Sequence, residues 1–316
     1  LNKLYKFLKH SSCMSWKKVL SLVFFLVVIG LLTFYWFIPV QELQLRTSGP
    51  KDTNFTMSSS SEENMQFYNN MRFPEPSISY RIENCPLQKA DDMKNAFFTI
   101  ENKTILRFYP VSNNEEILVT CDSKAKFEGD LFIAGEGGPT NITQSGDFNV
   151  ITKGAVTLLR DSTCENPNVA IHELLHVLGF DHSKNKNNIM YNISKCNQEI
   201  GQDTINFIDE IYAIPSLPDL TFENASASMK GRYLDVNISI RNEGLKSSES
   251  GKITIYADNK SIKELELKSL PVGSGRLVYL TNILVVQTSI SELRLVINYN
   301  FEELKKENNL IALEIK

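Results

Sequence analysis

The sequence predicts a multidomain protein with an N-terminal transmembrane helix, an α/β domain and an all-β sandwich. Three observations predict this fold class. Residues 19–40 carry no charged side chain. Strand-like and helix-like apolar spacings alternate between Ile78 and Ile214. From Pro218 onward only short runs with period-two alternation remain. The 316 residues have room for an anchor and two domains.

The N-terminal 40 residues predict a membrane anchor. Residues 1–18 contain five lysines and no acidic residue, which predicts a cytoplasmic N-terminus. Residues 19–40 would form a helix about 33 Å long, enough to span the hydrocarbon layer. The alternative is a cleaved signal peptide and a secreted product. It is less favoured because such a peptide has an apolar region of about 7 to 15 residues and a small-residue cleavage site.

Residues 41–76 are polar and include the run S-S-S-S-E-E-N. No convincing periodicity is present, so a flexible linker is expected. A pro-segment is the rival interpretation.

Residues 77–215 are expected to form the α/β domain. The runs S-I-S-Y-R-I, I-L-R-F-Y, E-I-L-V-T and A-V-T-L-L-R predict strands, and residues 87–100 have helical apolar spacing. A helix between consecutive strands implies parallel pairing. Residues 202–214 predict a further helix, which Pro215 closes.

The segment 169–183 reads V-A-I-H-E-L-L-H-V-L-G-F-D-H-S. His172 and His176 are four residues apart, so a helix presents both imidazoles on one face. Gly179 suits the helix end because glycine adopts a left-handed turn without strain. His182 then returns a third imidazole to the same place. These three histidines therefore predict a site for one catalytic Zn²⁺ ion, with a fourth position open for water.

The motif H-E-x-x-H by itself also occurs on solvated helices that carry two surface histidines and bind no metal. The added glycine and third histidine argue against that interpretation, since His10 is the one other histidine in the chain. Glu173 lies between the first two histidines, where its carboxylate can act as general base toward a zinc-activated water.

This motif resembles the metzincin clan of zinc endopeptidases. Ser183 after the third histidine is typical of matrixins (the M10 peptidase type), and Met190 lies at the spacing of the methionine turn beneath the zinc. The resemblance implies a zincin-like fold that hydrolyses peptide bonds, with an antiparallel edge strand for extended substrate near residues 131–140. No motif supports a Ca²⁺ site.

The chain departs from matrixins in two places. The linker has no cysteine that could ligate zinc from a pro-segment, and Asn192 stands where matrixins continue with proline. The matrixin resemblance therefore gives no expectation for the shape of the specificity pocket. Metzincin-like aminopeptidases, which bind a second zinc through cysteines, would need cysteine pairs after the third histidine, and Cys196 is alone there.

Residues 216–316 predict an immunoglobulin-like sandwich of about seven strands. The opening P-D-L, the N-E-G after the second strand and the E-N-N before the last resemble the CARDB adhesion-type domain. Such a domain is either a spacer or a module that binds a cell-surface ligand.

Cys85, Cys121, Cys164 and Cys196 follow the predicted anchor, and four cysteines allow three disulfide pairings. The metzincin resemblance implies the pair Cys85–Cys121, because the strands that end at these residues are neighbours in the metzincin sheet. It also implies Cys164–Cys196, because one precedes the active-site helix and the other follows the methionine turn. A free thiol at the zinc is the alternative.

The formal charge is −4, and removal of the five cytoplasmic lysines leaves about −9, which disfavours nucleic acid as a partner. We therefore expect a single-pass cell-membrane protein whose extracellular domain is a zinc endopeptidase acting on protein or peptide substrates. The alternative is a cell-surface adhesion protein whose zinc domain is mainly structural.

Overall fold

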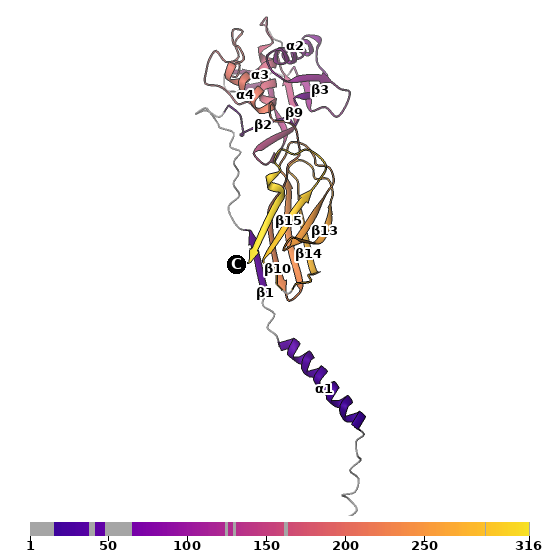
Figure 1. Cartoon of the computed structure of the whole chain (residues 1–316). Coiled ribbons are helices and arrows are strands. Elements are labelled where there is room, and N and C mark those ends of the chain that lie inside the picture. Colours follow the sequence, from indigo (N-terminus) through magenta and orange to yellow (C-terminus); the bar gives the residue numbers. More distant parts are fainter. Residues whose placement is uncertain are drawn as a thin grey trace, which may run out of the picture.

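The computed structural model describes residues 16–37, 42–47, 65–123, 126–128, 131–160, 164–287 and 289–315. These residues form an N-terminal helix, an α/β domain and a β-sandwich (Figure 1). In that view the sandwich lies between the helix and the α/β domain.

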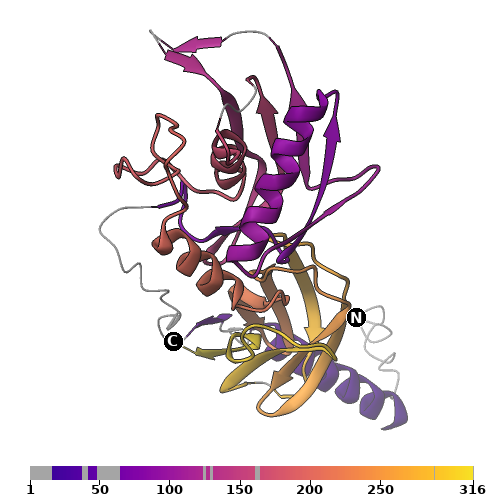
Figure 2. The ribbon, with the colours of Figure 1, turned by 90° about the horizontal axis from the view of Figure 1, so that it is seen from above.

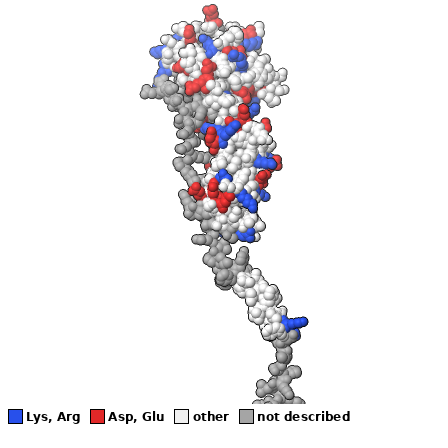
Figure 3. All heavy atoms as spheres, in the orientation of Figure 1, with Lys and Arg blue, Asp and Glu red and all other residues white. Residues whose placement is uncertain are grey.

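The helix α1 (Trp16–Phe37) begins three residues before the predicted span. Within the described chain it is the one helix long and apolar enough to cross a membrane, and none of its window from Trp16 to Thr33 is buried. Apart from blue lysine atoms at one end, it is white in Figure 3. A signal sequence would share these features, so the anchor stays a prediction.

The α/β domain is built on a mainly parallel sheet in the order β2-β9-β5-β3-β4, with β8 antiparallel to β9. The predicted parallel pairing and the antiparallel edge strand are both present. The strands are β2 (Met71–Arg72), β3 (Ser77–Glu83), β4 (Arg107–Pro110), β5 (Ile117–Cys121), β8 (Gly135–Ser145) and β9 (Phe148–Leu158).

In the part of the chain that the structure describes, three helices complete this domain: α2 (Leu87–Lys103), α3 (Asn168–Val177) and α4 (Gln202–Tyr212). Their apolar faces share one buried core with the sheet, because helix and strand residues of the right period all point inward. The short hairpin of β6 (Lys126–Glu128) and β7 (Leu131–Ile133) projects from the domain (Figure 2).

Among the described residues, the sandwich contains eight strands in the order β13-β12-β15-β16-β1-β10-β11-β14. Seven of them follow the α/β domain, which agrees with the predicted number. Their bounds are β10 (Leu220–Lys230), β11 (Tyr233–Asn242), β12 (Gly251–Ala257), β13 (Lys260–Leu267), β14 (Gly275–Leu284), β15 (Glu292–Asn298) and β16 (Leu310–Ile315), and a short 3₁₀ helix η1 (Glu307–Asn309) precedes β16. Alternate strand residues form a separate apolar core.

The eighth strand, β1 (Glu42–Thr47), comes from the segment expected to be a linker. It pairs antiparallel with β10 and β16, with Leu43 opposite Met229 and Leu45 opposite Ile315. The sequence E-L-Q-L-R-T alternates, but it is short, and both of its partner strands lie far along the chain. Local pattern therefore did not identify it. Residues 48–64 of the expected linker lie outside the described residues.

The two domains meet at the turn between β8 and β9. The Ser145 hydroxyl is fully buried and lies 2.6 Å from the Gly244 carbonyl oxygen, to which it donates a hydrogen bond. Phe148 and Val150 of β9 form a small apolar cluster with Leu245 of the sandwich. The strand β8 is thus held at its C-terminal end by the sandwich.

Candidate metal centre

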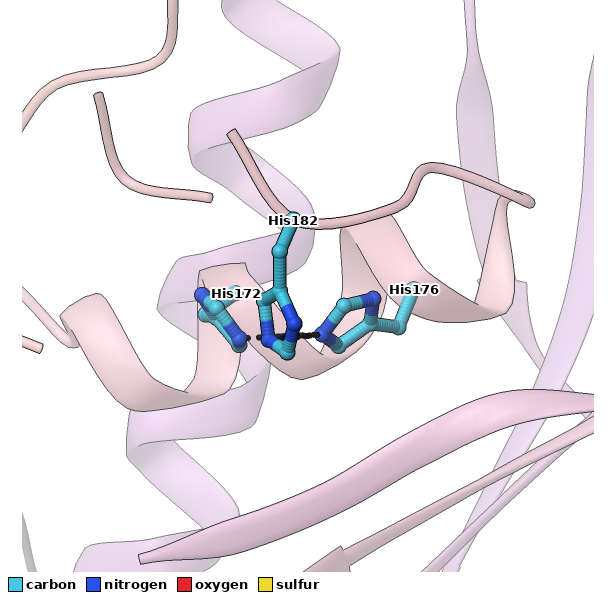
Figure 4. A group of neighbouring side chains, drawn as sticks. All are labelled: His172, His176 and His182. Carbon is cyan, nitrogen blue, oxygen red and sulfur yellow. Dashed lines mark hydrogen bonds between the residues drawn. The ribbon is translucent and has the colours of Figure 1, made fainter. Parts of the chain in front are cut away.

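Three histidine side chains converge at the end of α3 (Figure 4). The Nε2 atom of His176 lies 3.0 Å from that of His172 and 3.2 Å from that of His182. Among the described residues this is the one group of three metal-ligating side chains with suitable spacing. Ligand nitrogens about 2.0–2.1 Å from a tetrahedral zinc lie about 3.3 Å apart, so the donor set fits that ion.

The hydrogen bonds of the first two histidines strengthen this fit. His172 Nδ1 lies 2.7 Å from the Ile189 carbonyl oxygen, and His176 Nδ1 lies 2.8 Å from that of Phe180. A carbonyl oxygen only accepts, so each Nδ1 carries the proton. In a neutral imidazole whose Nδ1 carries the proton, the Nε2 atom bears a lone pair. Two lone pairs 3.0 Å apart repel each other unless a cation lies between them.

Both of these imidazoles are held in the neutral form. Burial lowers the pKa of His172 to about 4, although the hydrogen bond to Ile189 opposes the shift. Burial also lowers the pKa of His176. The pair therefore presents neutral nitrogen donors at pH 7, the form that ligates metal.

The chain after α3 brings His182 back to this pair. Gly179 has φ +95°, a left-handed conformation that ends the helix as predicted. The Ser183 amide donates to the carbonyl oxygen of Met190, whose side chain is buried. The carbonyl oxygen of Ile189, the residue before Met190, accepts the hydrogen bond from His172. The carbonyl oxygen of Met190 holds Ser183, the residue after His182. The methionine turn therefore supports both the first and the third histidine.

The Glu173 side chain is buried beside the histidines and faces the N-terminal part of β8. A Cβ atom on Gly135 would lie 2.7 Å from Glu173 Cγ. Burial raises the pKa of Glu173 to about 8, the nearby Glu136 carboxylate adds to the rise, and a hydrogen bond from Gly137 opposes it. A cation at the three histidines would lower this pKa.

The segment 131–140, where the edge strand was expected, contains the glycines Gly135, Gly137 and Gly138. The structure uses Gly135 and Gly137 to bring β8 against α3. Glu136, between them, forms an ion pair with Lys126 of the projecting hairpin at 2.6 Å.

Disulfide bonds join Cys85 to Cys121 and Cys164 to Cys196, the pairing that the metzincin resemblance implied. The strands β3 and β5, which end beside the first pair, are parallel neighbours. The second bond connects the segment before α3 to the segment after the methionine turn. No thiol is therefore free at the histidines among these four cysteines.

One residue at this centre was missed by the sequence interpretation. Phe67, in the expected linker, stacks on His176 with ring centroids 5.6 Å apart and an interplanar angle of 24°. Its one signal in the sequence is an aromatic pair, F-Y, in a polar stretch.

Comparison with known families agrees with these domains. The matrixin family model, of the M10 peptidase type, matches residues 72–213, and the CARDB family model matches residues 217–312. The expected boundaries were 77–215 and 216–316. No curated protein matches the chain.

Solved structures show weaker likeness. A crystal structure of a Pyrococcus furiosus CARDB domain, described in complex with di-metal ions, has 16% identity and a TM-score of 0.26, covering 32% of this chain and 88% of that chain. A solution structure of that domain has 18% identity and a TM-score of 0.27, and the match covers 32% of this chain and 94% of that chain. High choriolytic enzyme 1, a hatching-enzyme zinc protease of the medaka fish Oryzias latipes, has 22% identity and a TM-score of 0.22. This match covers 34% of this chain and 46% of that chain.

The two family matches cover consecutive parts of the chain, and each falls on one of the two domains described above. The chain therefore contains a matrixin-like α/β domain followed by a CARDB β-sandwich domain.

Proposed function

We propose that this protein is a membrane-anchored, extracellular zinc endopeptidase. The observation that carries the proposal is the pair of buried imidazoles whose Nδ1 atoms both donate to carbonyl oxygens, which leaves two Nε2 lone pairs 3.0 Å apart. A structural histidine pair would avoid this arrangement, whereas a cation stabilises it.

His172, His176 and His182 would hold the zinc ion. When bound, zinc supplies Lewis-acid chemistry, because it lowers the pKa of a coordinated water to around 7 and polarises a carbonyl group. Glu173 contributes the proton transfers: its buried carboxylate takes a proton from the attacking water and delivers it to the leaving amine. Its position beside β8 supports this role, because an extended peptide that pairs with that edge strand lies next to the carboxylate.

The proposed location rests on α1 and on the disulfides. The strand β1 begins five residues after α1 ends, so an anchored α1 would place the sandwich next to the membrane surface. Two disulfides suit an oxidising compartment. Retention in the membrane fraction after carbonate extraction supports the anchor, and recovery of soluble protein with a new N-terminus near Gln41 would show a cleaved signal peptide.

The catalytic proposal is tested with two variants of the full chain. Glu173→Gln keeps the shape of the side chain and removes its basicity, so zinc content should equal that of the wild type while peptidase activity falls by at least about 100-fold. His182→Ala should lower the zinc content itself. Equal activity of Glu173→Gln and wild type on a peptide library would exclude the assigned role.

The sandwich is the second candidate for a function. Leu277 and Tyr279 of the edge strand β14 are largely exposed, with 60% and 67% of their surface accessible. An adhesion protein with a structural zinc domain would use such a surface. In that case Glu173→Gln would leave the biological activity of the protein unchanged.

A further inference from the structure

Residues 65–67, which we term the strap, lie across the loop that connects the second and third histidines. The Asp181 amide donates to the Met65 carbonyl oxygen at 2.9 Å, and the Phe67 amide donates to the Gly179 carbonyl oxygen at 3.0 Å. Between these bonds, Gln66 forms an antiparallel bridge with Phe180. The strap therefore holds the loop on both sides of Phe180.

This attachment acts on a histidine through one carbonyl group. The Phe180 carbonyl oxygen accepts the hydrogen bond from His176 Nδ1. A partner of this kind fixes the tautomer and the ring orientation of a metal-ligating histidine. Phe67 adds a second restraint, because its ring stacks on the imidazole of His176. The strap thus fixes the partner of His176 and covers its ring.

The strap is itself firmly held. The side-chain amide of the buried Gln66 both accepts from the Met71 amide at 2.8 Å and donates to the Met71 carbonyl oxygen at 2.7 Å. Arg72, next along the chain, is 1% exposed and donates to the Ile211 and Ile214 carbonyl oxygens near the end of α4. A Cβ atom on Gly179 would lie 2.6 Å from Met71 Cβ, so this glycine permits the close approach of Met71, to which Gln66 of the strap is bonded.

We propose that Phe67 is a positioning residue for His176 and that the strap is an integral part of the zinc site, which rests on zinc binding as proposed above. Phe67 is 40% exposed, and one face of its ring meets a candidate ligand. The strap also precedes residue 72, where the matrixin match begins, so it is a feature of this chain outside the matched region.

Zinc retention by the full-length protein in detergent tests the proposal without reference to peptidase activity. The protein is mixed with pyridine-2,6-dicarboxylate, and transfer of zinc to this chelator is followed over time. The contact of an aromatic pair is worth a factor of about 2 to 12 in an equilibrium constant. The dissociation constant for zinc, taken from the final partition of zinc between protein and chelator, should therefore be higher for Phe67→Ala than for the wild type by a factor in that range. Phe67→Tyr should retain zinc like the wild type.

Two further variants separate stacking from structural loss. Tyr68→Ala truncates the neighbouring aromatic, which is 60% exposed, and should leave zinc retention unchanged. Phe67→Leu preserves apolar volume without an aromatic face, so it should resemble Phe67→Ala, and it replaces that variant if the alanine protein does not fold. Thermal unfolding of the zinc-free proteins should be the same for Phe67→Leu and Phe67→Tyr.

Equal zinc retention by Phe67→Leu, Phe67→Tyr and Tyr68→Ala would overturn the positioning role. A lower unfolding temperature of zinc-free Phe67→Leu that accounts for its zinc loss would also overturn it, in favour of a structural role. Failure of the wild type to bind zinc is a different result, because it would remove the proposed function together with this inference.

Discussion

A Cβ atom on Gly137 would lie 2.2 Å from the backbone carbonyl oxygen of Glu173. The strand β8 therefore approaches α3 as closely as backbone atoms permit. This approach places the edge strand beside the proposed general base, and any side chain at Gly137 would separate them.

The first prediction compares two adjacent glycines of β8. Gly137→Ala should force β8 and α3 apart and lower kcat/KM by about 100-fold, the cost expected for a displacement of about 1 Å at an active site. Gly138→Ala is the matched control, because a Cβ atom there has no other atom within 4 Å. Similar kcat/KM values for the two variants would show that the contact with Glu173 does not matter.

The second prediction compares the two disulfides. They close loops of similar length, with sequence separations of 36 and 32, so replacing either pair by serine should cost roughly 3–4 kcal/mol of unfolding free energy. Loss of Cys164–Cys196 should also weaken zinc binding, since this bond joins the two segments that flank the histidines. Loss of Cys85–Cys121 should not. Denaturant titration and zinc competition measure the two effects, and equal zinc affinity in both variants would contradict this prediction.

The third prediction concerns the joint between the domains. Gly146 has φ +54°, and a Cβ atom there would lie 2.8 Å from the Glu243 carbonyl oxygen. Gly273 has φ +66°, and a Cβ atom there would lie 2.5 Å from the Gln144 carbonyl oxygen. Alanine at either position should cost about 1–2 kcal/mol from the left-handed backbone alone. Both variants disturb the same contact between the α/β domain and the sandwich. Their effects on the unfolding free energy should therefore be less than additive.

Lys305→Ala is the control for the joint, since the ion pair of Lys305 with Asp147 spans 3.6 Å and is partly exposed. Its effect should be below about 1 kcal/mol. Strict additivity of the two glycine variants would indicate that the domains do not support each other at this joint.

The fourth prediction is a pH dependence in the sandwich. Burial raises the pKa of Asp219 to about 6, against the hydrogen bond from Asn308. The folded state therefore holds a proton that the unfolded state releases, and the stability that this proton contributes is lost as pH rises from about 4 to about 6. Asp219→Asn should remove this loss and raise stability at pH 7 by on the order of 2 kcal/mol. Thermal unfolding of both proteins at pH 4 and pH 7 measures it; an equal difference at the two pH values would exclude Asp219 as the cause.

The elements with strong local periodicity were predictable from the sequence. The spacing of His172 and His176 on one helix face, the left-handed Gly179 and the return of His182 follow from helix geometry and glycine stereochemistry. The alternating strands of the sandwich and the helix α4 follow from periods of two and 3.6 residues. In each case the information lies within about 15 residues of chain.

The tertiary structure alone decided what depends on distant partners. The strand β1 is defined by pairing with β10 and β16, Phe67 by its contact with His176, and Gly137 by the approach of α3. The alternation in β1 is short, and the segments around Phe67 and Gly137 carry no local pattern that distinguishes them from a polar linker or a flexible loop. Their roles arise because hydrogen bonding and close packing act between segments that the fold brings together, and a single sequence does not record which segments those are.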